Sequence, residues 1–264
     1  MNTFADYILS EQDLASKLEI TYYLSKKTKI FFDKSVVLKL ELLRLFLKYS
    51  KIEVDENEMF TIALLCNCKK VNNAQDMEKI QTYAKNGAEY LSSIGFDQRF
   101  CKICEEVNRY SKSTPRERES DILELVDHFG GMILDRPERI GFKPDEALVL
   151  LEHRNLKNKY NRYLETFRDF ICFLEDINVG DIVNISIIRR LVKIHNETED
   201  VTKFIKKVMN DFRPKVDKLF ESKNKDVSKE MFKESDNINR PLFSEETAKK
   251  IMGTINKENE SYDF

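Results

Sequence analysis

The stretch 122–151 constrains the fold of this chain more than any other part of the sequence. Its first half carries apolar side chains at the spacing of one helix face, namely Ile122, Leu125, Val126, Phe129, Met132 and Ile133. Asp135-Arg136-Pro137 is expected to end this helix. Pro144 suits the first position of a second helix, because proline has no N–H to lose there, and two acidic residues follow it. The stretch therefore predicts two helices joined by a turn.

Two features of the first of these helices need an explanation. Gly130 and Gly131 lie inside it, and each costs about 1 kcal/mol relative to alanine, so we expect another part of the chain to press on that face. Asp127 lies on or beside the apolar stripe, where an unpaired charge is expensive. We therefore expect a salt bridge from Asp127 to a lysine, with Lys70 as the partner.

Composition places the chain in the all-α class. With only 7 Gly and 5 Pro among 264 residues, it lacks the turn-rich pattern of a sheet protein. The run 34–49 is apolar around most of its circumference, as the central helix of a bundle requires. Further helices are expected over 56–71, 76–91, 100–110, 155–177 and 201–220, with two weaker pieces before residue 25.

Charge and hydropathy exclude several classes of function. The 44 basic and 46 acidic residues leave a net charge of −2, so no overall field concentrates nucleic acid, and we expect no nucleic-acid partner. No apolar run approaches the roughly 20 residues of a membrane helix, and the N-terminal residues lack a basic region followed by an apolar core. We therefore expect no membrane insertion and a cytoplasmic location. Five cysteines without an export signal indicate reduced thiols.

The segment 126–148, VDHFGGMILDRPERIGFKPDEAL, carries a pattern that extends beyond helix physics. The residues that form the pattern are Asp127, Phe129, Asp135, Arg136, Pro137, Arg139, Glu146 and Ala147. In these positions the segment resembles, without gaps, the end of the HD-GYP domain, a family within the HD hydrolase superfamily. The resemblance implies an all-α bundle whose relatives bind iron or manganese ions and hydrolyse cyclic di-GMP. Asp127 takes the place of a metal-ligating aspartate in that pattern.

The other metal ligands of the family are missing from this chain. Lys34 stands where the family has its first histidine, and Tyr83 stands where it has a later one. Cys66 and Asn67 take the places of the histidine–aspartate pair that names the superfamily, and an amide cannot supply the negative charge that bridges two cations. The resemblance therefore implies vestigial positions at Cys66, Asn67, Tyr83 and Asp127, with no bound metal and no other cofactor.

Packing residues are kept where the ligands are lost. Gly87, Ala88, Leu91, Ile94, Gly95 and Phe96 match the family around Tyr83, and Lys70 matches the lysine that follows the histidine–aspartate pair. Ser111 and Lys112 fall where paired histidines belong, the G-Y-P loop is absent, and Asn184 replaces a final aspartate. The resemblance implies a degenerate HD-GYP-like domain over 34–196, with a helical insertion around 155–177. It leaves an N-terminal helical segment at 1–33, a C-terminal helix at 197–222 and a polar, flexible tail at 223–264.

The cysteines offer one alternative metal site. Cys66 and Cys68 form a C-x-C pair, Cys101 and Cys104 form a C-x-x-C pair, and four thiolates can hold structural zinc. Both pairs fall within expected helices, where residues two apart point to different faces, and zinc motifs normally use loops. Buried cysteine also acts simply as a small hydrophobe, which is the interpretation we favour.

Basic residues offer an anion site in place of the metal. Lys34, Lys70, Lys112 and Arg116 are expected to line the vacated pocket, since ammonium and guanidinium groups bind phosphate without a metal. A cyclic dinucleotide is therefore a possible ligand. The alternative is a solvated charged face, with Asp127 held in a structural salt bridge.

Aromatic residues of the expected insertion offer a surface for partners. Tyr160, Tyr163, Phe167, Phe170 and Phe173 lie near one face at helical spacing, and aromatic clusters are favoured anchors in protein interfaces. The alternative is that they cover the core of the domain itself.

Three functions follow from these observations. The first is a catalytically inactive HD-GYP-like protein that acts as a regulatory, interaction or scaffold protein, with a protein partner or self-association. The second is a regulator that binds a cyclic dinucleotide or another phosphate ligand without hydrolysing it. The third is a phosphodiesterase with a remodelled metal site. We favour the first, because most of the metal ligands and the G-Y-P loop are missing.

Overall fold

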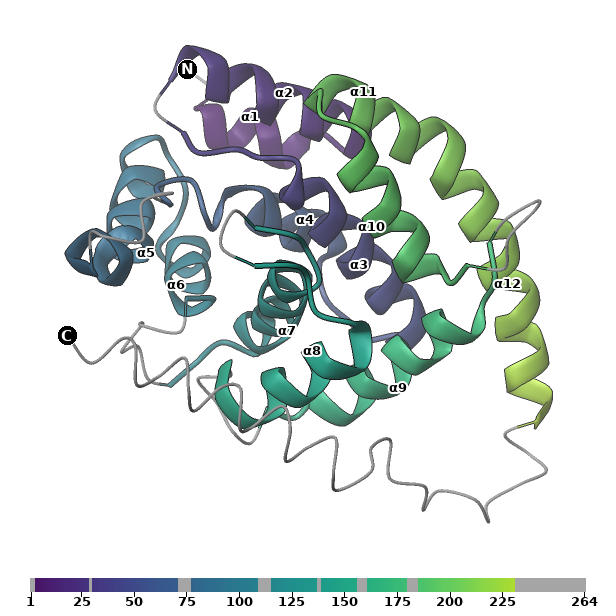
Figure 1. Ribbon diagram of the computed structural model, residues 1–264. Coiled ribbons are helices and arrows are strands. Elements are labelled where there is room, and N and C mark those ends of the chain that lie inside the picture. Colours follow the sequence, from purple (N-terminus) through teal and green to yellow (C-terminus); the bar gives the residue numbers. More distant parts are fainter. Residues whose placement is uncertain are drawn as a thin grey trace.

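The computed structural model describes residues 3–28, 30–70, 77–108, 115–136, 139–155, 161–179 and 185–230. Their regular elements are helices (Figure 1), written α for α-helices and η for short π-helical segments. They are α1 (Phe4–Ser10), α2 (Leu14–Lys27), α3 (Ser35–Ser50), α4 (Glu56–Leu65), α5 (Met77–Ser93), α6 (Gln98–Glu106), α7 (Arg118–Met132), α8 (Pro144–Leu150), η1 (Leu151–Asn155), α9 (Leu164–Asp176), α10 (Ile187–Glu197), α11 (Val201–Lys206), η2 (Lys207–Phe212) and α12 (Arg213–Glu230). Within these ranges the strand-like pairings are isolated bridges, and no strand forms. The all-α prediction is therefore confirmed for the described residues.

The central helix is α3, as the apolar run 34–49 predicts. Helices α4, α7, α9 and α10 all contact it, and Figure 1 shows it in the middle of the bundle. From Val36 to Leu47 every side chain of α3 is buried except Arg44, which is partly exposed. Two of the buried side chains, Lys39 and Glu41, are charged. Their partners decide how the neighbouring helices pack, because a buried charge needs an opposite one.

Acidic residues fix the starts of several helices. The carboxylates of Asp13, Asp55, Asp97 and Asp200 accept backbone N–H groups at the beginnings of α2, α4, α6 and α11. Pro144 opens α8 as predicted, and the N–H of Lys143 donates to the carboxylate of Glu146 at 3.0 Å. These local signals set the positions at which the helices begin.

Some helix ends differ from those predicted. The helix expected over 56–71 ends at Leu65, and Cys66–Lys69 form a turn in which the Cys68 N–H donates to the Leu65 carbonyl at 2.9 Å. Helix α7 ends at Met132, before Asp135, because the Arg139 guanidinium satisfies the carbonyls of Gly131 and Met132, both at 2.9 Å. The helix expected over 155–177 begins only at Leu164.

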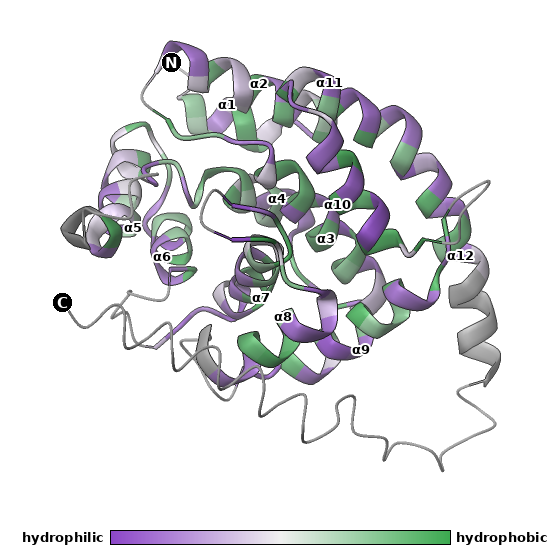
Figure 2. Cartoon of the chain, viewed as in Figure 1, coloured by the Kyte–Doolittle hydropathy of each residue, from purple (hydrophilic) through white to green (hydrophobic). Residues whose placement is uncertain are grey.

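One continuous hydrophobic core runs through the described residues, from Ala5 in α1 to Phe220 in α12. In Figure 2 the central α3 and α4 are largely green, whereas α11 shows much purple on its visible side. The segments 1–33 and 197–222 therefore pack on the same core as the predicted domain 34–196. Of the predicted tail 223–264, α12 covers residues up to Glu230, and residues 231–264 lie outside the described part. Among the described helices, none is both long and apolar enough to cross a bilayer.

The aromatic side chains of α9 belong to this core, and the predicted interaction surface is corrected accordingly. Phe167 and Phe170 have no exposed surface, and their rings lie 5.1 and 5.3 Å from the Phe46 ring of α3. Tyr163 is partly buried at the start of α9, and Tyr160 lies outside the described residues. The cause is the packing of α9 directly on α3, where large rings fill the space between the two helices. Phe167 and Phe170 are therefore unavailable to anchor a partner.

Candidate functional site

Asp127 and its partners form the candidate site, where α3, α7 and the turn after α4 meet. One carboxylate oxygen of Asp127, Oδ1, accepts a hydrogen bond from the Lys39 ammonium at 2.6 Å. The same oxygen accepts a second hydrogen bond from the Asn67 side-chain amide at 2.8 Å. The side chains of Lys39 and Asp127 are 9% and 19% exposed, so water screens this ion pair only partly.

Electrostatics stabilises the charged forms of both partners. Burial alone would raise the pKa of Asp127, but the positive charges of Lys39, Lys70 and His128 outweigh it and hold that pKa well below its usual range. Burial alone would lower the pKa of Lys39, but the carboxylate of Asp127 outweighs it and raises the pKa above its usual value. The pair is therefore ionised throughout the neutral range.

The expected salt bridge of Asp127 thus exists, but its partner is Lys39 rather than Lys70. The reason lies in the paired glycines of α7. A Cβ atom added to Gly130 would lie only 2.8 Å from Cγ of Lys39. Because glycine has no side chain, it leaves room for the aliphatic part of the Lys39 side chain to cross α7. The sequence predicted that something presses on this face, and the Lys39 side chain is that group.

Lys70 lies beside this pair as a second positive charge. The proximity of Lys39, followed by burial, lowers the pKa of Lys70. Within the described residues no carboxylate lies within ion-pair distance of its ammonium, which faces the Phe31 ring at 5.8 Å from the ring centre. Arg136 adds to the positive potential that Lys70 experiences, while Asp33 reduces it. The site as a whole is rich in cations.

The donor set does not suit a metal centre of the kind that the HD-GYP family binds. Lys39 already places a positive charge against Asp127, and Asn67 presents its amide N–H₂ to the same carboxylate. Burial, and then the charge of Asp127, raises the pKa of the Cys66 thiol, which keeps it protonated and unsuited to a metal. Tyr83 lies within the described ranges. Across those ranges, no three histidine, cysteine, aspartate or glutamate side chains come close enough together to hold a metal ion.

The four clustered cysteines are buried thiols. Cys66 and Cys68 lie in the turn after α4 and not inside a helix, which corrects the predicted placement, while Cys101 and Cys104 lie in α6 as expected. Burial raises the pKa of Cys68 to about 12 and raises that of Cys104 well above its ordinary value. Protonated thiols in an apolar setting act as small hydrophobic side chains.

The predicted anion site of Lys34, Lys70, Lys112 and Arg116 is not assembled as expected. The Lys34 ammonium donates to the carbonyls of His195 and Thr198 at 2.6 and 3.0 Å, where it caps the end of α10. The Arg116 guanidinium is bound to the buried carboxylates of Asp121 and Glu124. Lys112 lies outside the described residues. Of this set, Lys70 alone is placed beside Asp127, because the charges of Lys34 and Arg116 meet structural needs of α10 and α7.

Sequence reasoning missed Lys39, the residue that pairs with Asp127. A usable signal existed, because Lys39 and Glu41 are charges inside the apolar run 34–49, and each needs a buried partner there. Arg136 was identified as part of a helix-ending turn and of the HD-GYP pattern, but not as a charge that acts on Lys70 through space. No sequence signal would have indicated that effect.

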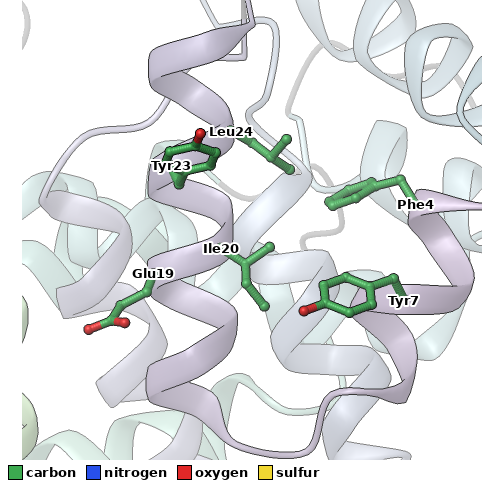
Figure 3. Close-up of a pocket in the computed structure, with 6 residues that line it drawn as sticks. All are labelled: Phe4, Tyr7, Glu19, Ile20, Tyr23 and Leu24. Carbon is green, nitrogen blue, oxygen red and sulfur yellow. The ribbon is translucent and has the colours of Figure 1, made fainter.

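A surface groove of about 420 Å³ lies between α1 and α2, away from these charges. In Figure 3 Phe4 and Tyr7 point from α1 towards Ile20 and Leu24 of α2. Tyr23 lies at the edge of the groove and is 63% exposed. The lining is largely apolar, and its polar groups are the Glu19 carboxylate and the hydroxyls of Tyr7 and Tyr23.

Comparison with known proteins identifies no relative of this chain. It matches no protein-family model, and no curated protein and no solved structure is significantly similar to it.

Proposed function

We propose that this chain is a catalytically inactive, HD-GYP-like helical protein that acts by binding, as a regulatory or scaffold protein. One observation carries the proposal: the Lys39 ammonium lies 2.6 Å from Asp127, the residue that resembles a metal ligand. A side-chain cation thus lies beside the position at which HD-GYP proteins hold a metal cation.

The Coulomb energy of the site favours this proposal over a remodelled phosphodiesterase. A divalent ion bound to Asp127 while Lys39 stayed in place would lie close to an ammonium group. At about 4 Å and an effective dielectric constant of about 20, that repulsion is about 8 kcal/mol. The neighbouring charges of Lys70 and Arg136 add to it. Metal binding would therefore require the displacement of Lys39 from the buried pair.

The packing around the site supports a fold kept for reasons other than chemistry. Phe129 and Ala147, which match the HD-GYP pattern, have no exposed surface. Gly87, another matching residue, would bring an added Cβ atom to 3.4 Å from the Cys68 sulfur. This packing does not depend on metal ligands, so the fold can serve a binding function without them.

Metal analysis and a hydrolysis assay on the purified protein test the proposal. We expect far less than one iron, manganese or zinc ion per chain, even after incubation with excess manganese, and no cleavage of cyclic di-GMP. Stoichiometric metal, or cleavage that disappears in Asp127→Ala, would overturn it. Light scattering over a range of protein concentrations then tests whether the binding function includes self-association.

A second candidate function, a regulator that binds a cyclic dinucleotide or another phosphate ligand without hydrolysing it, is favoured by Lys70. Its pKa is lowered by Lys39 and by burial, so a nearby anion would stabilise its charged form. Calorimetric titration with cyclic di-GMP tests this function. We expect binding that Lys70→Ala weakens and that Lys85→Ala, an exposed lysine of α5, leaves unchanged. Equal binding by both variants would remove this candidate.

A further inference from the structure

The surface between α1 and α2 combines exposed aromatic rings with exposed charges. Tyr7 and Tyr23 are 58% and 63% exposed, and they are two of the three large apolar side chains that stand exposed within the described ranges. Both line the groove between these helices, Tyr7 from α1 and Tyr23 from α2 (Figure 3). Exposed aromatic rings gathered at an apolar groove are typical of a surface that binds another protein.

Two opposite charges flank the Tyr23 ring on the exposed face of α2. Glu19, Tyr23 and Lys27 are exposed and follow one another at intervals of four residues, so they lie on one side of the helix. The Lys27 ammonium lies over the Tyr23 ring, 5.7 Å from its centre, and Glu19 lines the groove beside that ring. Among the described residues, no opposite charge lies within ion-pair distance of the Glu19 carboxylate or the Lys27 ammonium. The face thus has a negative end, an aromatic centre and a positive end.

This order of charges is complementary to itself. When two copies of α2 pack antiparallel about a two-fold axis at Tyr23, residues equally far from Tyr23 on opposite sides face each other. Glu19 and Lys27 are both four residues from Tyr23, so Glu19 of each copy meets Lys27 of the other, and the axis produces two ion pairs. A parallel pairing in register would bring Glu19 to Glu19 and Lys27 to Lys27. The charges therefore select the antiparallel arrangement of a second copy of this chain.

We propose that the protein forms a two-fold homodimer through this α1–α2 surface, with Tyr23 of each copy packed against Tyr23 and Tyr7 of the other. The interface rests on two helix faces and on ion pairs that water screens, which places it among weak, transient contacts. It differs from the aromatic residues of α9, which are buried in the core, and it shares no residue with the Asp127 centre. The dimer gives the proposed binding function a surface, but it holds whether or not that centre is inactive.

Sedimentation velocity of the full chain, at concentrations from about 1 μM to about 1 mM, tests for the dimer. We expect a monomer–dimer equilibrium that shifts towards dimer as the concentration rises. Tyr23→Ala removes the ring at the two-fold axis and should weaken the dimer about tenfold or more, since buried aromatic anchors dominate small interfaces. Lys218→Glu, an exposed lysine of α12, is the control for charge reversal and should associate as the unmodified chain does.

Charge reversal on α2 tests the two-fold geometry. Glu19→Lys would set two cations against each other at both ion pairs, and Lys27→Glu would set two anions against each other. Each variant alone should therefore dimerise about tenfold more weakly than the unmodified chain. Mixed in equal amounts, the two variants restore opposite charges at both pairs, so we expect them to form a heterodimer with an affinity close to that of the unmodified dimer.

Three results would each overturn the proposed dimer. The first is an unmodified chain that stays monomeric up to the highest concentration, which would leave the surface to a different partner. The second is dimerisation that Tyr23→Ala retains in full, with folding checked by circular dichroism. The third is a mixture of Glu19→Lys and Lys27→Glu that associates no better than either variant alone. These measurements involve neither metal content nor hydrolysis, so their failure is distinct from a failure of the function proposed for the Asp127 centre.

Discussion

At the scale of single residues, Asp127 is the acceptor on which two buried donors depend. Asp127→Ala would leave the Lys39 ammonium, 9% exposed, without its counterion and Asn67 without its acceptor. We expect a loss of about 3 to 5 kcal/mol in the free energy of unfolding, as for other broken buried ion pairs. Urea denaturation measures it. Asp211→Ala, an exposed carboxylate of η2, is the matched control and should change stability by less than about 0.5 kcal/mol.

The double variant Asp127→Leu with Lys39→Met separates the cost of a broken pair from the value of the intact one. Replacing both charges by apolar groups of similar volume removes the uncompensated ammonium. We expect this variant to recover most of the stability that Asp127→Ala loses. A double variant as unstable as the single one would show that the pair itself, and not the orphaned charge, carries the energy.

Lys17 provides a prediction for alkaline pH. Its side chain is fully buried between α1, α2 and α4, with its ammonium bound to the Ile8 carbonyl at 2.7 Å and to the Thr61 hydroxyl at 2.6 Å. Burial lowers the pKa of Lys17 to about 8. Between pH 8 and about 10.4 the unfolded chain binds more protons at this residue, so its contribution to stability rises with pH by about 3 kcal/mol.

The comparison of the unmodified chain with Lys17→Met isolates this effect. Below pH 8 the penalty of burying a charged amine is constant, and only the unmodified chain carries it. We expect the free energy of unfolding of Lys17→Met, relative to the unmodified chain, to fall as the pH rises from 8 to about 10.4. The buried thiols titrate in both proteins and cancel. A difference that stays constant over this range would contradict the prediction.

At this scale the sequence predicted the need for a cation at Asp127 but not its identity. An aspartate beside an apolar stripe requires a counterion, which is local information. The choice between Lys39 and Lys70 depends on where α3 crosses α7, and that is set by packing over many residues. Gly130 marked the crossing point, but only the structure shows that Lys39 occupies it.

At the scale of the helix, the two glycines of α7 form a matched pair with opposite expected effects. In Gly130→Ala the new Cβ would meet Cγ of Lys39 at 2.8 Å, in the middle of a stem held by its ion pair. We expect overpacking of about 1 to 3 kcal/mol to exceed the gain of about 1 kcal/mol in helix propensity. The variant should therefore unfold at a lower urea concentration than the unmodified chain.

Gly131→Ala is the control, because its new Cβ would meet only Nη2 of Arg136 at 3.1 Å. That atom is the far end of a flexible side chain and can move. We expect a change between zero and about 1 kcal/mol of stabilisation, the difference in helix propensity. Equal destabilisation by both substitutions would show that the contact with Lys39 is not the cause.

Helix existence was predicted better than helix ends. The helices α3, α7 and α8 follow from apolar spacing and from Pro144, which are signals within one element. The end of α4 at Leu65 and the start of α9 at Leu164 do not, because apolar side chains continue past the first boundary and aromatic ones precede the second. The aromatic residues of α9 show the same limit of sequence analysis. Their helical spacing is the same whether that face of the helix points into the core or towards a partner.

At the scale of the whole molecule, Glu41 joins the C-terminal helix to the central one. Arg213, the first residue of α12, donates to a carboxylate of α3 that is fully buried. Arg213→Ala leaves Glu41 paired with Arg44 alone, and we expect a loss of about 1 to 3 kcal/mol, as for other hydrogen bonds to buried charges. Because one core spans α1 to α12, the helical signal and tyrosine fluorescence should fall in a single transition.

Thermal unfolding followed by both signals checks this prediction. Lys218→Ala, on the exposed side of the same helix, should leave the midpoint unchanged. Separate transitions for the two signals, or an unchanged midpoint in Arg213→Ala, would mean that α12 is not coupled to the core through Glu41.

The cation beside Asp127 is a side chain, and it is therefore made on the ribosome together with the rest of the protein. A metal centre must be loaded after synthesis, competes with other proteins for scarce ions and can be stripped by chelators. If Lys39 stands in for a metal ion as we propose, the protein avoids all three dependencies, and chains made with or without available iron and manganese should be equivalent. On the same proposal a lysine cannot be exchanged as a metal ion can, so changes in metal supply should not switch this centre on or off.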